Sequence, residues 1–252
     1  MSDLAGVAAT LRAAGCVFAE DEARVLLSAA HDAGELAAMI ARRVAGQPLE
    51  HIVGFAEFCG RTLAVEPGVF VPRRRTEFLV AQAIALAPAR PVIVDLCCGC
   101  GAVATALSVL APIRLYAVDV DPVAVRCARR NVPGEVLEGD LYAPLPPDLR
   151  GRIDLVVANA PYVPTDAIDL MPAEARDYET KVALDGGADG LDVARRVVAG
   201  AGEWLNATGH LLIETSEAQA PDLTDTMMAY GLTAWTLSDD DLGATVVIGR
   251  FA

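Results

Sequence analysis

The sequence predicts an α/β fold in which a small helical N-terminal unit precedes a doubly wound sheet. From residue 91 onward, short apolar runs alternate with segments whose apolar residues recur at helical spacing, which is typical of parallel βαβ units. A glycine-rich turn follows the first of these runs. The chain has 252 residues, of which 54% are hydrophobic and 21% charged, so it can bury a sizeable core. These observations exclude a disordered chain.

The first third of the chain is predicted to be helical and then to change character. Residues 3–14, 20–31 and 34–45 carry apolar positions at helical spacing, with breaks at Gly15 and near Gly34. Between Gln47 and Pro72, glycines and prolines separate short apolar runs, which predicts a hairpin-like connector. We therefore expect a helical domain at 1–45, a connector at 46–75 and an α/β domain at 76–252.

Seven strands are expected in the α/β domain, after a first helix at residues 76–87. The predicted strands are residues 91–96, 114–119, 134–138, 153–158, 210–215, 232–237 and 244–250, and the predicted helices between them are 102–110, 122–131, 192–205 and 219–230. Residues 159–191 read as a long irregular stretch. Ligands of doubly wound sheets bind at the carboxyl ends of the strands, which is where the unusual residues of this chain lie.

Charge and composition restrict the partners and the compartment. The net charge of −14, from 20 basic and 34 acidic residues, disfavours stable nucleic-acid binding, because affinity for phosphate backbones depends largely on Lys and Arg. No apolar run reaches the roughly 20 residues needed to span a bilayer. The first residues lack the basic-then-apolar order of a signal peptide. A cytoplasmic protein with free thiols at its six cysteines is expected.

The first predicted strand ends in a loop suited to an adenosine cofactor. Asp95 stands before the loop, and Gly99 and Gly101 permit positive φ and close approach of a ligand to the backbone. Asp119 ends the second strand, where an acid can accept from both ribose hydroxyls. Asp140 follows the third strand and could accept from an adenine amino group. One such acid alone would more often cap a turn or helix; three at neighbouring strand ends indicate a cofactor.

The sequence of this loop allows two other interpretations. The glycine spacing also matches the dinucleotide fingerprint, so an NAD-dependent oxidoreductase is an alternative. A carboxylate at Asp95 suits the ammonium group of S-adenosylmethionine better than a pyrophosphate, which makes S-adenosylmethionine the expected cofactor. Cys97, Cys98 and Cys100 lack a fourth ligand, so no metal is expected, and cysteine also serves as a small apolar residue in a tight loop.

The fourth strand is followed by Asn159-Ala160-Pro161-Tyr162. This segment resembles the Asn-Pro-Pro-Tyr motif of amino-group methyltransferases. An amide nitrogen is a poor nucleophile, and acceptors at the Asn159 side chain and the residue-160 carbonyl would orient its NH₂ group. Pro161 biases Ala160 toward an extended backbone, and Tyr162 offers a flat face for a planar group. The alternative is a strand-end turn with Asn and Pro for conformational reasons alone.

From about residue 46 to 250 the chain resembles the protein-(glutamine-N5) methyltransferases, which modify a glutamine of peptide-chain release factors. The matching stretches are residues 46–54, 67–73, 95–104, 117–119, 139–141, 159–162 and 183–191. The resemblance implies a Rossmann-like methyltransferase sheet, cofactor contacts at residues 97–101, Asp119, Leu141 and Asn159, and a target glutamine at residues 159–162. It also implies a substrate contact at Arg73 and a release-factor grip by the helical N-terminal unit.

The chain departs from the family pattern at several positions. The family's Pro-Arg-Pro-Glu/Asp-Thr-Glu reads Pro72-Arg-Arg-Arg-Thr-Glu77, which replaces an acid by Arg75. Ala160 replaces a proline, Cys97 and Cys98 replace small residues, and the N-terminal unit is shorter. We expect methyl transfer from S-adenosylmethionine to the side-chain amide nitrogen of a protein glutamine. The alternatives are a methyltransferase for exocyclic amines of nucleic-acid bases and a cofactor-binding protein without catalysis.

Overall fold

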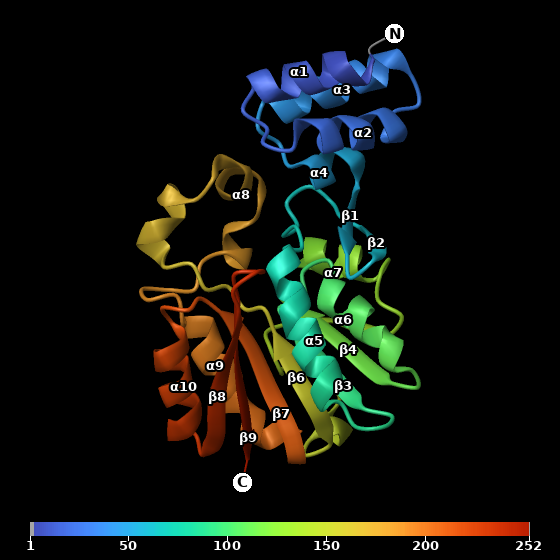
Figure 1. The fold of residues 1–252 in the computed structure, drawn as a ribbon. Helices are drawn as coiled ribbons and strands as arrows, with labels where there is room; N and C mark the ends of the chain where they lie inside the picture. Colours follow the sequence, from blue (N-terminus) through green and yellow to red (C-terminus); the bar gives the residue numbers. More distant parts are fainter. Residues whose placement is uncertain (1–2, 252) are drawn as a thin grey trace.

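The computed structural model describes residues 3–251 and consists of a helical unit above an α/β sheet (Figure 1). The sheet has seven strands in the order β5-β4-β3-β6-β7-β9-β8. This arrangement confirms the predicted doubly wound α/β fold with a small helical N-terminal unit. No helix in the described part of the chain is long and apolar enough to cross a membrane.

The N-terminal unit contains four helices around a small apolar cluster of its own. They are α1 (Leu4–Ala13), α2 (Ala19–Ala29), α3 (Ala33–Val44) and α4 (Leu49–Val53). The carboxylates of Asp3 and Asp32 cap α1 and α3 by accepting from the N–H groups of Gly6 and Glu35. The short helix α4 lies in the expected connector and buries Ile52 in the helical cluster. The boundary between unit and connector stays a prediction.

An antiparallel hairpin links this unit to the sheet. It consists of β1 (Phe55–Phe58) and β2 (Arg61–Ala64), and its turn residues Cys59 and Gly60 both have positive φ. Such φ values give a turn whose twist matches that of the strands. Phe58 and Leu63 are buried in the core beneath the sheet helices, which fixes the hairpin to the larger unit.

Five strands of the sheet pair in parallel, and β9 pairs antiparallel with β7 on one side and β8 on the other, so among the described strands β9 alone runs opposite to the rest. The parallel strands are β3 (Val92–Leu96), β4 (Arg114–Asp119), β5 (Glu135–Glu138), β6 (Ile153–Ala158) and β7 (Leu205–Thr215); the others are β8 (Leu232–Asp239) and β9 (Ala244–Phe251). Alternate residues face opposite cores: Ile93 packs in one cluster and Val94 in the other. Burial on both faces explains why the sequence shows continuous apolar runs here.

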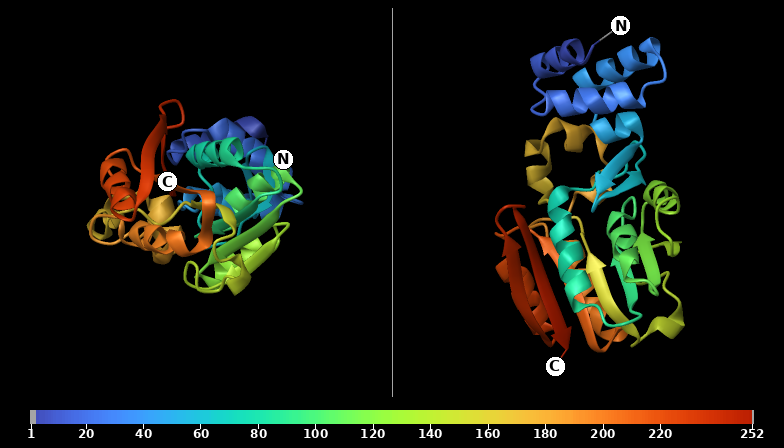
Figure 2. Two further views of the ribbon diagram at one scale, coloured as in Figure 1. Left: turned by 90° about the horizontal axis from the view of Figure 1, so that it is seen from below. Right: turned by 45° about the vertical axis from the view of Figure 1, so that its right-hand side comes forward.

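Helices cover both faces of the sheet (Figure 2). One face carries α5 (Glu77–Leu86), α6 (Ala102–Leu107) and α7 (Pro122–Ala128), and the other carries α9 (Asp192–Trp204) and α10 (Ala220–Ala229). The connection after β6 contains short helical turns and α8 (Ala173–Tyr178), where the sequence predicts irregular chain. The Tyr178 hydroxyl donates to the Ala45 carbonyl oxygen at 3.3 Å, so this connection reaches the helical unit.

Arg43 joins three segments at this contact. Its Nε donates to the Glu22 carboxylate of α2 and its Nη1 to the Glu174 carboxylate of α8, both at 2.5 Å. The Arg43 side chain is only 8% exposed and that of Glu22 only 13%. Removing the arginine would therefore leave a buried carboxylate without its counter-charge.

We expect Arg43→Met to lower the free energy of unfolding by roughly 3 kcal/mol, because it breaks a buried ion pair. Urea denaturation measures this change. The matched control is Arg24→Met, which breaks the exposed Arg24–Asp21 pair and should change the free energy by less than about 0.5 kcal/mol. Equal effects of the two variants would contradict the role given to Arg43.

Candidate active site

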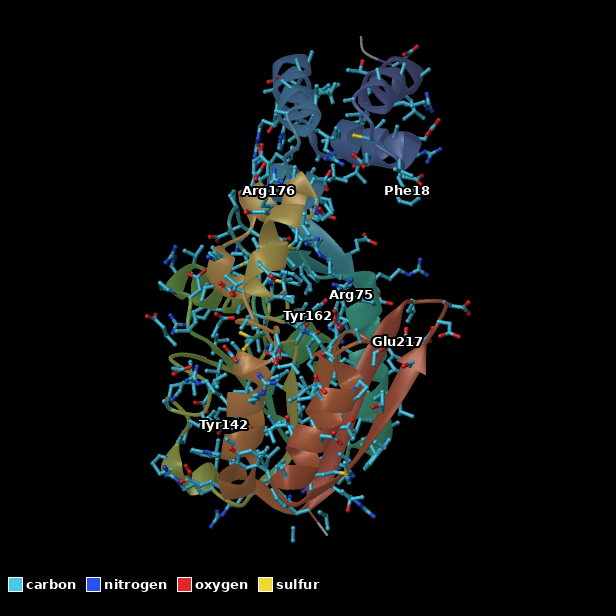
Figure 3. The ribbon with its side chains drawn as sticks, turned by 90° about the vertical axis from the view of Figure 1, so that its left-hand side faces the viewer. Phe18, Arg75, Tyr142, Tyr162, Arg176 and Glu217 are labelled. Carbon is cyan, nitrogen blue, oxygen red and sulfur yellow. The ribbon has the colours of Figure 1, made fainter. Side chains whose placement is uncertain are left out.

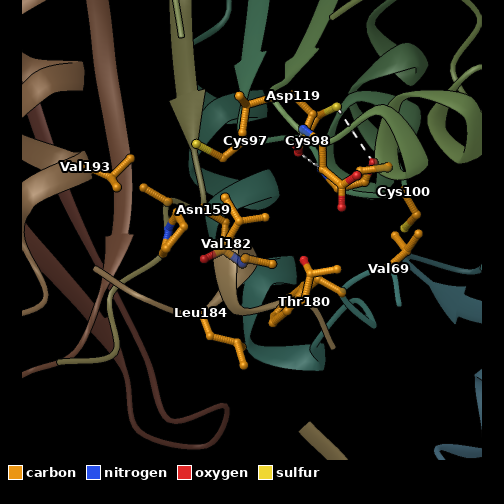
Figure 4. Close-up of a pocket in the computed structure, with 18 of the residues that line it drawn as sticks. Val69, Cys97, Cys98, Cys100, Asp119, Asn159, Thr180, Val182, Leu184 and Val193 are labelled. Carbon is orange, nitrogen blue, oxygen red and sulfur yellow. Dashed lines mark hydrogen bonds between the residues drawn. The ribbon is translucent and has the colours of Figure 1, made fainter. Parts of the chain in front are cut away.

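A cavity of about 450 Å³ opens at the carboxyl ends of the parallel strands (Figure 4). It collects nearly all of the residues singled out in the sequence. Those that line it are Arg73, Asp95, Cys97, Cys98, Gly99, Cys100, Asp119, Asp140, Leu141, Asn159, Ala160, Pro161 and Tyr162. Gly101 lies directly behind the lining and does not face the cavity. The roles assigned to these residues stay predictions.

The strand register places the predicted cofactor residue Asp119 and the predicted acceptor residue Asn159 at the same level of the sheet. In β3, Leu96 pairs with Val118 of β4 and with Ala158 of β6. The next residue of each neighbouring strand is therefore Asp119 on one side and Asn159 on the other. Both enter the cavity from the same edge of the sheet (Figure 4).

In the glycine loop, there is space beside Gly99 and none beside Gly101. Gly99 has a φ of 56°, and a Cβ added there would meet no described atom within 4 Å, so the cavity reaches its backbone. Gly101 has a φ of 79° and caps α6; its Cβ would lie 2.4 Å from Cγ2 of Val132. Gly99 therefore leaves space for a ligand, and Gly101 lets Ala128 at the end of α7 and Val132 beyond it pack closely against the loop.

Two carboxylates hold the loop in this shape. Asp95 is 1% exposed and accepts from the Ala104 N–H at 2.9 Å, so it anchors the first turn of α6. Asp119 accepts from the Gly99 N–H at 2.8 Å and from the Asp121 N–H at 2.9 Å, one on each oxygen. Each oxygen of Asp119 keeps a further lone pair for a ligand hydroxyl. The fixed carboxylate beside an open glycine fits a ribose-bearing cofactor.

The third acid lies at the outer end of the cavity. Asp140 pairs with Arg196 of α9, and both side chains are about half exposed. The following residue, Leu141, has a φ of 48°, which is rare for a residue with a side chain. The pairing with Arg196 was not predicted from the sequence. Asp140 and Leu141 both line the cavity, and the adenine contact of Asp140 stays a prediction.

The loop cysteines are apolar lining residues. All six cysteines of the chain are free, and Cys98 and Cys100 are buried. Burial raises the pKa of the Cys100 thiol to about 12 and also raises the pKa values of Cys97 and Cys98, so these groups are neutral thiols. The described residues contain no group of three or more metal-ligating side chains.

Residues 159–162 are the predicted acceptor site, and hydrogen bonds from and to other segments hold them in place. The Asn159 Nδ2 donates to the Thr76 hydroxyl oxygen at 3.3 Å, which leaves its Oδ1 unused. The Tyr162 carbonyl oxygen accepts from Gln219 Nε2 at 2.9 Å. A Cβ on Gly190 would lie 2.3 Å from that same carbonyl oxygen, so the glycine-rich stretch 183–191 packs directly beneath the motif.

The two arginines at the mouth of the cavity are each paired with a buried carboxylate. Arg73 donates to Glu179 at 2.6 Å, and its guanidinium lies 4.8 Å from the centre of the Phe70 ring. The Arg75 Nε lies 3.4 Å from Glu214 Oε1, and the Arg75 guanidinium also contacts the Tyr162 hydroxyl (Figure 3). Arg73 is thus engaged within the protein, and its predicted substrate contact stays a prediction.

Four residues of the site were not singled out from the sequence: Thr76, Glu179, Glu214 and Gln219. Glu214 could have been recognised in the sequence, because this acid directly follows the apolar run Leu211–Ile213 in a predicted strand that is part of β7. A charged residue in a buried parallel strand is unusual unless it is paired. The other three lie in loops or at helix ends, where polar residues are ordinary.

Comparison with known proteins places the chain among methyltransferases. The family model described as Ribosomal protein L11 methyltransferase (PrmA) matches residues 80–169. Release factor glutamine methyltransferase of Geobacter sulfurreducens is 37% identical, over 85% of this chain and 78% of that protein. The 4-amino-L-phenylalanine/4-methylamino-L-phenylalanine methyltransferase of Streptomyces pristinaespiralis is 34% identical, over 76% and 69%. A methyltransferase crystal structure from Pyrococcus furiosus shares the fold, with a TM-score of 0.59 at 14% identity over 83% of this chain and 95% of that chain.

The buried carboxyl of Asp95 should make stability depend on pH. Burial raises the pKa of Asp95 from 3.8 to about 8. The folded state therefore keeps a proton that the unfolded chain releases, so stability from this group is lost as pH rises between these values. We expect the thermal stability of Asp95→Asn relative to the parent to increase with pH from about 4 to about 8. A difference that stays constant over this range would contradict the assignment.

The anchored carboxylate of Asp119 should control cofactor affinity. In Asp119→Asn, an NH₂ group replaces one of the two carboxylate oxygens, so at that position the side chain accepts neither the backbone N–H that it held nor a ribose hydroxyl. Loss of charge-assisted hydrogen bonds should weaken S-adenosylmethionine binding by about 10- to 100-fold in calorimetry. Asp148→Asn makes the same charge change at an exposed site, and its affinity should equal that of the parent. Unchanged affinity in Asp119→Asn would refute the ribose contact.

Proposed function

This chain belongs to the release factor glutamine methyltransferase family, and we propose that it methylates the side-chain amide nitrogen of a glutamine in a peptide-chain release factor. It is an S-adenosylmethionine-dependent methyltransferase. The substrate assignment is supported most by Asn159, whose Oδ1 is left free by the bond from its Nδ2 to Thr76 and which enters the same cavity as Asp119.

The residues of the acceptor slot, defined as Asn159–Tyr162, match the chemistry of an amide. The lone pair of an amide nitrogen is delocalised into its carbonyl, so the nitrogen needs help to act as a nucleophile. In the proposed complex, Asn159 Oδ1 and the Ala160 carbonyl oxygen accept the two N–H groups and turn the nitrogen toward the donor. Tyr162 covers one face of the planar amide.

The cofactor is proposed to lie between Asp119 and the glycine loop, with its adenine toward Leu141. When bound, S-adenosylmethionine supplies an activated methyl group. The chain contributes alignment of the two reactants, which can be worth roughly 7–11 kcal/mol. The apolar thiols of the loop exclude water from this part of the cavity.

The remaining parts of the chain are assigned by extension. We propose that residues 1–45 recognise the protein substrate and that residues 76–252 form the methyltransferase domain. Residues 46–75 are proposed to connect these two domains. The reaction would take place in the cytoplasm, where translation occurs. A net charge of −14 makes stable nucleic-acid binding unfavourable.

A planar arylamine is the second candidate acceptor. The Streptomyces pristinaespiralis relative acts, by its name, on 4-amino-L-phenylalanine and 4-methylamino-L-phenylalanine. Such an amine could use the same two acceptors, because it also presents two N–H groups in a plane. The two candidates differ in size, and only the glutamine of a polypeptide needs the space above the cavity mouth.

The experiment that separates them uses methyl-labelled S-adenosylmethionine with purified release factors in one arm and 4-amino-L-phenylalanine in the other. Peptide mass spectrometry should find one added methyl group on a release-factor glutamine. Transfer to the arylamine alone would replace the proposal by the second candidate, and transfer to neither would remove both.

Asn159→Ala should lower transfer to the release factor by roughly 100-fold or more, because the amide loses its orienting acceptor. Calorimetry should find cofactor affinity within about threefold of the parent, a small change on the free-energy scale of binding. Parental turnover in Asn159→Ala would remove the catalytic assignment. A proportional loss of cofactor binding would reassign Asn159 to the cofactor.

A further inference from the structure

The acceptor slot is a short stretch of chain that lies between two paired segments. Pairing of β6 with its neighbours β3 and β7 ends at Ala158, and the next bridged residue along the described chain is Val163, which pairs in parallel with Asp185. The slot therefore crosses from the sheet to the glycine-rich stretch 183–191. Its backbone is not oriented by a strand ladder, so other contacts must orient it.

The side chain of Gln219 provides such a contact from the start of α10. Its Nε2 donates to the Tyr162 carbonyl oxygen at 2.9 Å and to the Asp189 carbonyl oxygen, also at 2.9 Å. These two bonds use both hydrogens of the NH₂ group. One amide group thereby joins the last residue of the acceptor slot to the glycine-rich stretch.

The orientation of this amide is fixed by its partners. A backbone carbonyl oxygen can only accept, so Nε2 and not Oε1 must face Tyr162 and Asp189. On its other side, Oε1 accepts from the Ser216 hydroxyl at 2.6 Å and from the Thr215 hydroxyl at 3.3 Å. The amide of Gln219 therefore uses both of its donors and both of its acceptor positions. A carboxylate of the same shape would place an acceptor against two carbonyl oxygens.

Two glycines leave the space that this contact requires. Gly190 has a φ of 79°, and a Cβ on it would lie 2.3 Å from Gln219 Nε2 and 2.3 Å from the Tyr162 carbonyl oxygen. A Cβ on Gly186 would lie 2.7 Å from the Pro161 carbonyl oxygen. The stretch thus approaches the backbone of the acceptor slot as closely as only glycine allows, at the point where Gln219 binds it.

The position of Gln219 in its own helix does not account for these bonds. It is the N-cap residue of α10, where a short polar side chain usually accepts from the first N–H groups of the helix. The Gln219 side chain makes no such bond within α10. It reaches away from the helix instead, and its donor is used on the acceptor slot.

We propose that Gln219 is a positioning residue for methyl transfer, which holds the backbone of Tyr162 and so keeps the acceptor slot in the shape that aligns the amide. The inference rests on the proposed function, because the slot is defined by the acceptor that it is proposed to bind. Gln219 does not line the cavity, so in this scheme it touches neither the acceptor nor the cofactor. Its replacement should lower turnover and leave cofactor affinity unchanged.

Gln219→Glu tests the proposal, because it keeps the shape of the side chain and turns its donor into an acceptor. The kcat on the release factor should fall roughly tenfold or more, since a misplacement of about 1 Å can cost about 100-fold. The KM for the release factor should stay within about threefold of the parent, because alignment and not binding is lost. Gln219→Met removes the donor without adding a charge and should lower kcat by less. It decides the question where the carboxylate prevents folding.

Gln82→Glu is the matched control. Gln82 is a half-exposed residue of α5 that does not line the cavity. The same chemical change there should leave kcat at the parental level. Cofactor affinity, measured by calorimetry, should be equal in the parent and all three variants. A loss of cofactor affinity in proportion to kcat in the Gln219 variants would contradict the positioning role.

Hydrogen exchange tests the contact without any acceptor. The Val163 N–H, directly after the slot, donates to the Leu184 carbonyl oxygen at 3.0 Å. Measured by nuclear magnetic resonance, this amide should exchange faster in Gln219→Glu and Gln219→Met than in the parent and Gln82→Glu, because the local structure opens more easily. An inactive parent with this exchange pattern would defeat the proposed function and leave Gln219 as the residue that holds the slot. Equal exchange rates, or a parental kcat in either Gln219 variant, would overturn the positioning role.

Discussion

The register of three parallel strands is the constraint on which the site depends. Because Leu96 pairs with Val118 and with Ala158, the residues that follow in β4 and β6, Asp119 and Asn159, leave the sheet at the same level. Neighbouring strands lie about 4.8 Å apart, so these two residues are separated by about 10 Å across the sheet. That span suits a cofactor held by its ribose at one end and reacting at the other. A one-residue slip of β6 would turn its side chains to opposite faces and separate the two halves.

Paired charges then hold the surrounding segments against this edge. Glu179 is buried after α8 and pairs with Arg73, and Glu214 is buried in β7 and pairs with Arg75. Both arginines belong to the segment that leads into α5, and their partners come from two distant segments of the chain. Burial of either carboxylate without its arginine would cost free energy, so the fold favours the arrangement in which both ion pairs form. The cavity mouth is thereby built from fixed side chains.

Local signals were sufficient to predict the sheet and to select the residues that are proposed to bind the cofactor. The apolar runs mark the strands, and Asp95, Gly99 and Asp119 lie within 25 residues of one another in the sequence. The acceptor half was predicted only from its motif. Its supports are long-range: Asn159 and Thr76 are 83 residues apart, and Arg75 and Glu214 are 139 apart. No periodicity in one sequence identifies which buried acid meets which arginine, because that depends on how the loops pack.

Arg75 replaces an acid of the family pattern, and the structure gives this replacement a physical meaning. An acid at position 75 would stand near Glu214, and two neighbouring carboxylates raise each other's pKa. Arginine has the opposite effect: burial raises the pKa of Glu214, and the charge of Arg75 and its contact with the carboxylate lower it. Compared with an acid, arginine at position 75 therefore favours the ionised form of Glu214. The Arg75 side chain is 42% exposed, so it also presents a positive charge to any polypeptide that brings a glutamine to Asn159. Arg75 therefore both contacts Tyr162 of the acceptor slot and can influence which polypeptide binds.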